Sequence, residues 1–155
     1  MAFRVYISHS VAPHELGAIY GVAELAAKKG MDPIVWDRAW DPAMPPARVT
    51  QLLNGLNAFV AIATVSGSHI EWINTELAEA LRSGLNQENV ISVLDEQVTP
   101  PSVGAVVKIN RSDLSSTIQE TVEILGRLHV GRNQKTLLAG LILGGLAALL
   151  LTSRD

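Results

Sequence analysis

The stretch Ser66-Gly67-Ser68-His69-Ile70-Glu71-Trp72-Ile73-Asn74-Thr75-Glu76 follows an apolar run, Ala58-Phe59-Val60-Ala61-Ile62-Ala63-Thr64. A short apolar run of this kind is typical of a strand that is buried on both faces of a parallel sheet. Ser68 with Glu71 three residues later forms a capping box, so we expect Ser68 to be the N-cap of a helix. The sequence therefore predicts a buried strand, a short loop and a helix that begins at Ile70.

The predicted helix carries two stripes. We expect Gly84 to end the helix, and its core stripe has helical spacing: Ile70, Ile73, Leu77 and Leu81. Trp72 and Glu76 lie four residues apart on a second stripe, roughly 100° around the helix. The glutamates at positions 71 and 79 are expected to be solvated. Because ligands of open α/β sheets bind beyond the carboxyl ends of the strands, Trp72 and Glu76 mark a candidate site at the margin of the core.

Composition bounds the class of protein. The chain has 155 residues, of which 48% are hydrophobic and 17% charged, and its net charge is −3. An acidic balance argues against a nucleic-acid-binding protein, for which a basic face is expected. The absence of cysteine excludes disulfides, thiolate catalysis and cysteine-ligated zinc. We expect no metal site, because metal-ligand spacing is lacking among the four histidines, His9, His14, His69 and His129.

The C-terminal region is strongly apolar. Residues Leu137 to Leu151 include no polar side chain, and basic residues precede them. A helix of this length spans about 22–26 Å, against about 30 Å for the hydrocarbon core of a bilayer. Gly140 and Gly144 have the GxxxG spacing that permits close helix–helix contact in lipid. We expect a domain over residues 1–131 and a membrane anchor over 132–155, with the N-terminal domain in the cytoplasm. The alternative is a buried C-terminal helix in a soluble oligomer.

The chain alternates between predicted strands and helices. The predicted strands span residues 4–8, 33–36, 58–64, 89–94 and 105–109. The predicted helices span residues 13–29, 47–56, 70–83, and a last one that Ser112 caps and that ends near Gly131. Its stripe consists of Leu114, Ile118, Val122 and Leu125. Alternation of this kind predicts an α/β fold, a flavodoxin-like three-layer sandwich whose five-stranded parallel sheet has the order 2-1-3-4-5, followed by an apolar C-terminal helix.

This strand order places a crevice between the first and third strands. Ser8-His9-Ser10 ends the first strand, and Ser66 follows the third. The loop after the second strand carries Trp36, Asp37 and Arg38 and is expected to overhang the crevice. Together with Glu76 and Trp72, these residues are predicted to form one pocket.

Four segments, in this order, resemble a bacterial TIR (Toll/interleukin-receptor) domain. The matching segments are Arg4–Ser10, Gly30–Asp37, Phe59–Ile62 with the later Ser66, Trp72 and Glu76, and Val90–Asp95. The resemblance covers roughly residues 3–128, and its most specific element is serine, then tryptophan, then glutamate four residues later. It implies that Glu76 is the essential residue for cleaving NAD+ at the nicotinamide–ribose bond. The chain departs from the family at residues 41–46, where many members have a glycine.

One carboxylate suits this chemistry. The nicotinamide of NAD+ is cationic and leaves as a neutral molecule, so a general acid is not required. A carboxylate near the ribose can stabilise an oxocarbenium-like transition state. We expect Trp72 or Trp36 to stack on a ring, and Ser8, His9 and Ser10 to meet phosphate or ribose. The alternative is structural: Trp72 shields the helix start, Ser8 and Ser10 cap a turn, and His9 is an exposed loop residue.

The leading hypothesis is a membrane-anchored NAD+ glycohydrolase or cyclase that self-associates and acts in bacterial antiviral defence or signalling. NAD+ is its substrate, and no cofactor is expected. Three alternatives stay open: a non-enzymatic TIR–TIR interaction module, a membrane-disrupting effector with a nucleotide-sensing domain, and an enzyme like the nucleoside deoxyribosyltransferases.

Overall fold

The computed structural model describes residues 3–35, 47–67 and 70–144, with the side chains of residues 3–35, 49–67 and 70–131. Five parallel strands form one sheet in the order β2-β1-β3-β4-β5, which confirms the predicted topology. The strands are β1 (Phe3–Ser10), β2 (Met31–Val35), β3 (Ala58–Ala63), β4 (Val90–Leu94) and β5 (Ala105–Lys108). The helices are α1 (Leu16–Lys28), α2 (Ala47–Leu53), α3 (Ile70–Arg82) and α4 (Leu114–Gly144).

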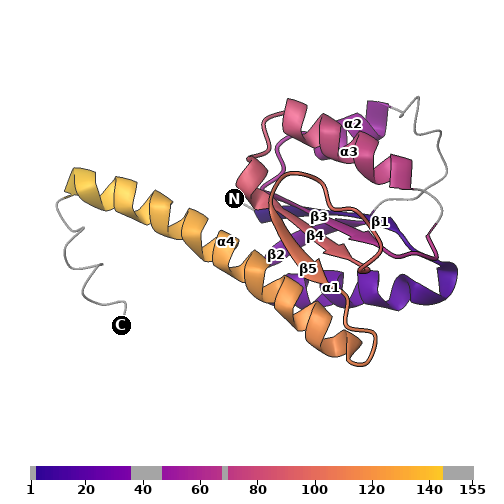
Figure 1. The fold of residues 1–155 in the computed structure, drawn as a ribbon. Coiled ribbons are helices and arrows are strands. Elements are labelled where there is room, and N and C mark those ends of the chain that lie inside the picture. Colours follow the sequence, from indigo (N-terminus) through magenta and orange to yellow (C-terminus); the bar gives the residue numbers. More distant parts are fainter. Residues whose placement is uncertain (1–2, 36–46, 68–69, 145–155) are drawn as a thin grey trace.

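Helices cover both faces of the sheet (Figure 1). Strand β1 shows how the sequence divides between them, because alternate side chains point to opposite faces of a strand. Phe3, Val5 and Ile7 enter the core shared with α1 and α4, whereas Tyr6 enters the core beneath α2 and α3. Strand β3 is therefore buried on both faces, as the apolar run predicts. Its neighbour β1 is buried at all but two positions.

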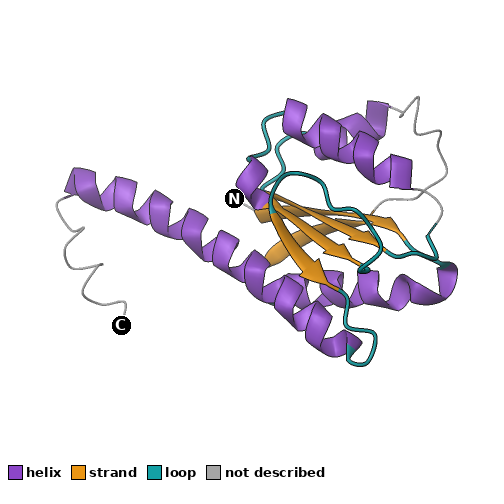
Figure 2. Ribbon diagram, viewed as in Figure 1, coloured by secondary structure: helices purple, strands orange, loops and turns teal. Residues whose placement is uncertain are grey.

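The connection from β4 to β5 contains no helix (Figure 2). Its residues Val98 and Val103 pack against the core beneath α2 and α3, so a loop covers the part of the sheet that a third helix would otherwise cover. Gly104 brings this loop back to the sheet with a φ of 78°, and a Cβ there would lie 2.0 Å from the carbonyl oxygen of Val90. Only glycine fits this approach.

Helix α3 differs from the prediction in its buried face. Ile73 and Leu77 are buried as expected, but Ile70 is 42% exposed and Ala80 takes its place in the core. Trp72 and Glu76 are buried as well. The buried face is therefore turned toward the second stripe, because α3 packs over β1 as well as β3. The predicted N-cap, Ser68, lies outside the described residues.

Two more glutamates on α3 were expected to be solvated. Glu71 is exposed, as predicted, whereas Glu79 is half-buried and pairs with Arg82 one turn later. The expectation for Glu79 is confirmed only in part, because its side chain is less exposed than that of its partner, Arg82.

Helix α4 starts and ends differently from the prediction. Asp113 rather than Ser112 caps it, because the Asp113 Oδ1 atom accepts the backbone N–H of Ser116 at 3.2 Å. The helix passes Gly131 without a break and continues to Gly144, projecting away from the sheet (Figure 1). A single glycine costs about 1 kcal/mol in a helix, which is too little to end it.

The predicted anchor, residues 132–155, is only partly described: the side chains of 132–144 and all of 145–155 lie outside the described residues. Among the helices searched, which are those of the described residues, none combines the length and the apolar character that crossing a membrane requires.

Candidate functional site

The Glu76 carboxylate lies between α3 and β1, and its residue is 0% exposed. The Tyr6 hydroxyl donates a hydrogen bond to Oε2, and the Ser8 hydroxyl donates one to Oε1 at 2.6 Å. Tyr6 and Ser8 are two residues apart on a strand, so both side chains point to the face that α3 covers. Each carboxylate oxygen therefore accepts a hydrogen bond from a hydroxyl group of β1.

Burial makes these hydrogen bonds important for the position of Glu76. A carboxylate removed from water is costly unless hydrogen bonds replace those to the solvent. The Tyr6 ring stacks on Phe59 of β3, with 5.7 Å between the ring centroids, which fixes the direction of its hydroxyl. Glu76 is thus held against β1 in one orientation, by a tyrosine whose ring packs on β3.

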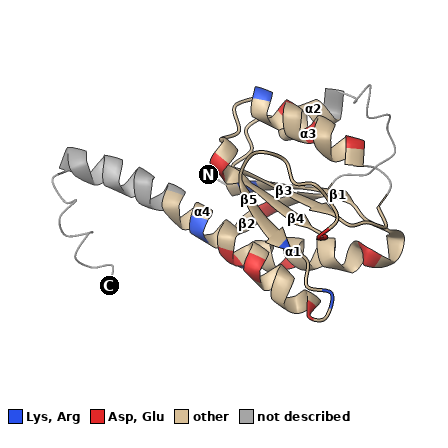
Figure 3. Cartoon of the chain, in the orientation of Figure 1, with Lys and Arg blue, Asp and Glu red and all other residues tan. Residues whose placement is uncertain are grey.

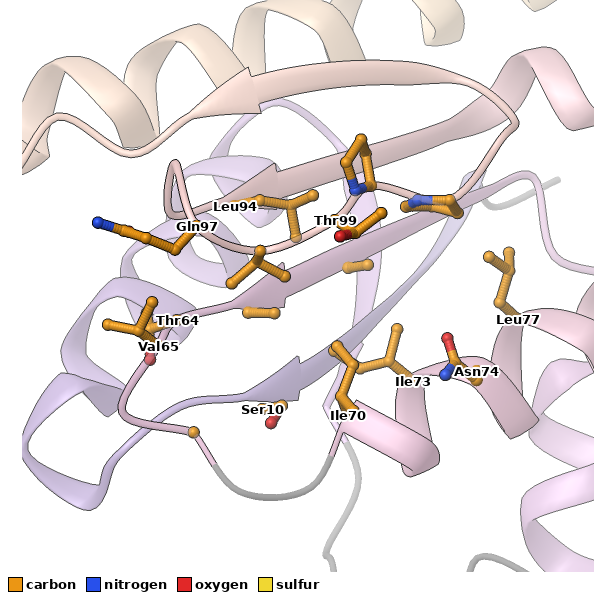
Figure 4. Close-up of a pocket in the computed structure, with 16 residues that line it drawn as sticks. Ser10, Thr64, Val65, Ile70, Ile73, Asn74, Leu77, Leu94, Gln97 and Thr99 are labelled. Carbon is orange, nitrogen blue, oxygen red and sulfur yellow. The ribbon is translucent and has the colours of Figure 1, made fainter.

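A cavity of about 530 Å³ lies beside this cluster, over the carboxyl ends of β3 and β4. Helix α3 forms one side, and residues 97–101 of the loop after β4 form the other (Figure 4). Ile70, Ile73 and Leu77 of α3 line it, whereas Glu76 does not, because Glu76 lies roughly 100° further around the helix. This cavity is therefore not the predicted pocket between the first and third strands. That pocket stays a prediction, because Trp36, Asp37 and Arg38, which were expected to overhang it, lie outside the described residues.

The sequence-predicted site residues fall into separate groups. Ser8 joins Glu76, and Ser10 lines the cavity. His9 is half-buried, and strand alternation turns its side chain to the opposite face from Ser8 and Ser10. Ser66 is exposed in the loop after β3, and Trp72 is buried on α3 without lining the cavity. Trp36, Asp37 and Arg38 lie outside the described residues.

The loop after β3 rests directly on the end of β1. The backbone N–H of Thr64 donates to the Ser10 carbonyl at 3.1 Å. A Cβ at Gly67 would lie 1.9 Å from that same carbonyl oxygen, so only a glycine permits this approach. Gly67 lines the cavity together with Ser10, so this contact shapes the cavity rim.

An ionic cluster that sequence reasoning missed joins four segments at the same edge of the sheet. Arg111, before α4, donates from Nη1 to Glu15 at 2.7 Å and from Nε and Nη2 to Asp95 at the end of β4. Glu15 also accepts a hydrogen bond from the hydroxyl group of Thr64 at 2.8 Å, and Asp95 accepts one from the backbone N–H of Val65 at 2.9 Å. The sequence does contain a signal for this cluster: Asp95 directly follows a buried strand, and Arg111 follows the next strand.

The cluster shifts the pKa values of its members. The hydrogen bond from Arg111 holds the pKa of Asp95 below its ordinary value against the opposing effect of burial. Burial, the largest influence on Glu15, raises its pKa, but hydrogen bonds from Ala12, Thr64 and Arg111 together lower it below the ordinary value. The two carboxylates raise the pKa of Arg111, Asp95 more than Glu15, so the arginine stays charged.

These shifts predict how stability depends on pH. Carboxylates with lowered pKa values stabilise the folded state above their unfolded pKa values of about 4, and this contribution is lost as the pH falls through the folded values. Because Arg111 is about half exposed, Arg111→Gln should cost only about 1–2 kcal/mol at pH 7. Urea unfolding of both proteins from pH 7 to pH 2 should show this difference shrinking below pH 4. A difference that is constant with pH would contradict the role of the cluster.

Comparison with models of protein families finds no match to this chain, and comparison with curated proteins finds none either. Among the described residues, no group of three or more His, Cys, Asp or Glu side chains could hold a metal ion. The candidate site therefore rests on its own geometry: a buried carboxylate held by two hydroxyl groups, beside a cavity at the carboxyl edge of a parallel sheet.

Proposed function

We propose that this protein is an NAD+ glycohydrolase and that Glu76 stabilises the transition state for loss of nicotinamide. The observation that carries the proposal is the placement of Glu76, buried on the helix after β3 and oriented by Tyr6 and Ser8. This is the position to which the TIR resemblance assigns the essential glutamate. Hydrolysis to ADP-ribose and cyclisation are both compatible with it.

The chemistry follows from the charge of the substrate. The nicotinamide–ribose bond breaks with its electron pair going to the cationic ring, so nicotinamide leaves neutral and positive charge develops on the ribose. A carboxylate held in a dry site stabilises that charge without reorganising. The hydroxyl groups of Tyr6 and Ser8 keep Glu76 in one orientation before substrate binds.

Access to Glu76 has to change during the reaction, because the residue is fully buried and both of its oxygens accept hydrogen bonds in this structure. We propose that a ribose hydroxyl replaces the hydroxyl of Ser8 as a donor to Glu76. Self-association, which the resemblance also implies, is the step that would permit this exchange.

The same burial favours a second candidate function. In this alternative, the carboxylate has a purely structural role: both of its oxygens accept hydrogen bonds from β1, and these bonds fasten α3 to the strand. The protein would then be a non-enzymatic interaction module that uses the fold as a docking surface, since a fold alone does not specify activity.

NAD+ consumption by the concentrated full-length protein separates these functions. Glu76→Gln keeps the side-chain shape and should lower the rate of NAD+ loss at least about 100-fold, because the charge that stabilises the transition state is removed. Glu71→Gln is the matched control on the exposed face of the same helix, and it should retain wild-type activity.

Circular dichroism should show that both variants are folded. If wild-type protein consumes no NAD+ at high concentration, or if the two variants are equally active, the enzymatic proposal is wrong and the interaction module is favoured.

We also propose that the apolar run Leu137–Leu151 anchors the protein to a membrane. Its support is the sequence, where Arg132 and Lys135 precede the run, together with the basic residue Arg127 that follows the acidic residues of α4 (Figure 3). Basic residues on this side favour a cytoplasmic position for the folded domain.

A charge in the middle of the run tests the anchor in the full-length protein. Leu143→Arg should move the protein from the vesicle fraction to the soluble fraction in flotation, because arginine at the bilayer centre costs about 2.5–3.5 kcal/mol. Thr152→Arg, at the end of the run, should still float. Flotation of Leu143→Arg at the wild-type level would contradict the proposal, as would failure of the wild-type protein to float.

A further inference from the structure

The cavity beside α3 lies where β3 carries two small side chains in succession on one face. Ala61 and Ala63 point into the core beneath α3, whereas Val60 and Ile62 fill the opposite core. Ala61 and Ala63 form part of the cavity floor, together with Leu94 of β4. Two alanines in succession on this face leave a volume that larger residues would occupy.

The walls of the cavity are apolar, with a few polar groups. Ile70, Ile73 and Leu77 face the cavity from α3 (Figure 4). Pro100 and Pro101 form a rigid part of the opposite wall, since proline fixes its own φ. Asn74 and Thr99 bring an amide and a hydroxyl group to opposite sides of the cavity. Two apolar walls with hydrogen-bonding groups at the edge suit a flat ring.

None of the described lining residues is charged. A charged ligand would lose its hydration without gaining an opposite charge, which is unfavourable. An anionic phosphate group is therefore a poor occupant. An uncharged ring with an amide or amino edge can use both the donors and the acceptors of Asn74 and Thr99.

A buried hydroxyl group lies on the same face of the sheet. Among the described residues, the Ser92 Oγ is the buried side-chain polar atom that has no hydrogen-bond partner. Ser92 pairs in register with Ala61 and lies two residues before Leu94, both of which line the cavity. A buried hydroxyl without a partner costs about 1–3 kcal/mol. Ser92 does not itself line the cavity, so this unpaired hydroxyl lies next to Ala61 and Leu94 of the cavity lining.

From these observations we infer that the cavity is a binding site for an uncharged heteroaromatic ring that carries an amide or amino edge, in the size range from a single ring to a nucleoside. A volume of about 530 Å³ lies within the range of small-molecule sites. This site is distinct from Glu76, whose carboxylate faces β1. Binding of a ring at this site does not depend on the proposed cleavage of NAD+.

Pairs of probes that differ in charge test this inference by calorimetry with the full-length protein. Nicotinamide and nicotinate share one shape, and adenosine and AMP differ by one phosphate. The uncharged member of at least one pair should bind, with a Kd at least about tenfold lower than that of its charged partner. The inference is wrong if neither uncharged probe binds at millimolar concentration, or if the charged partners bind equally well.

Variants then locate the bound probe. Ala63→Leu fills the cavity floor and should weaken binding at least about tenfold. Asn74→Leu changes an exposed rim residue with little risk to folding and should weaken binding several-fold, whereas Gln87→Leu, exposed elsewhere, should not. If Ala63→Leu does not fold, the comparison of Asn74→Leu with Gln87→Leu decides.

Glu76→Gln separates this site from the proposed catalytic one, because it should retain probe binding even where NAD+ cleavage is lost. Binding that survives Asn74→Leu and a folded Ala63→Leu, or that is lost in Glu76→Gln, would place the probe elsewhere and overturn the inference.

Discussion

A carboxylate without contact to water has to be satisfied inside the protein, and this constraint organises the candidate site. Glu76 meets it by accepting hydrogen bonds from the hydroxyl groups of Tyr6 and Ser8, so α3 is attached to β1 by polar contacts as well as apolar ones. Apolar packing alone would tolerate small rotations of a helix, whereas hydrogen bonds to a defined pair of hydroxyl groups do not. The orientation of α3 in turn decides which of its side chains face the cavity over β3 and β4.

The carboxyl edge of the sheet is held in place by contacts between segments far apart in the sequence. Arg111 joins Glu15 to Asp95, and Gly67 lets the loop after β3 rest on the end of β1. The contact at Gly67 shapes the rim of the cavity, whose described lining residues are uncharged, and the buried Glu76 lies to its side. The edge therefore combines two chemically different places: a buried carboxylate held by two hydroxyl groups, and a largely apolar cavity.

Local patterns predicted the strand order and the position of Glu76, because alternation of strands and helices and the spacing from Trp72 to Glu76 are properties of short segments. Features that depend on distant segments were not predictable in this way. The pairing of Glu15 with Arg111 joins residues 96 positions apart. The exposure of Ile70 follows from how α3 lies over the sheet. Helix α4 continues past Gly131 because the low helix propensity of one glycine costs too little free energy to end a long helix. The predicted contacts of Trp36, Asp37 and Arg38 stay predictions.

The energetic coupling between Tyr6 and Glu76 tests the central contact most directly. In a double-mutant cycle with Tyr6→Phe and Glu76→Ala, unfolding in urea gives the free energy of each variant. Because the hydroxyl and the carboxylate are buried partners, the two changes should be non-additive by about 1–3 kcal/mol. Additivity to within about 0.5 kcal/mol would show that the two side chains do not interact, and would contradict the account of how α3 and the candidate site are held.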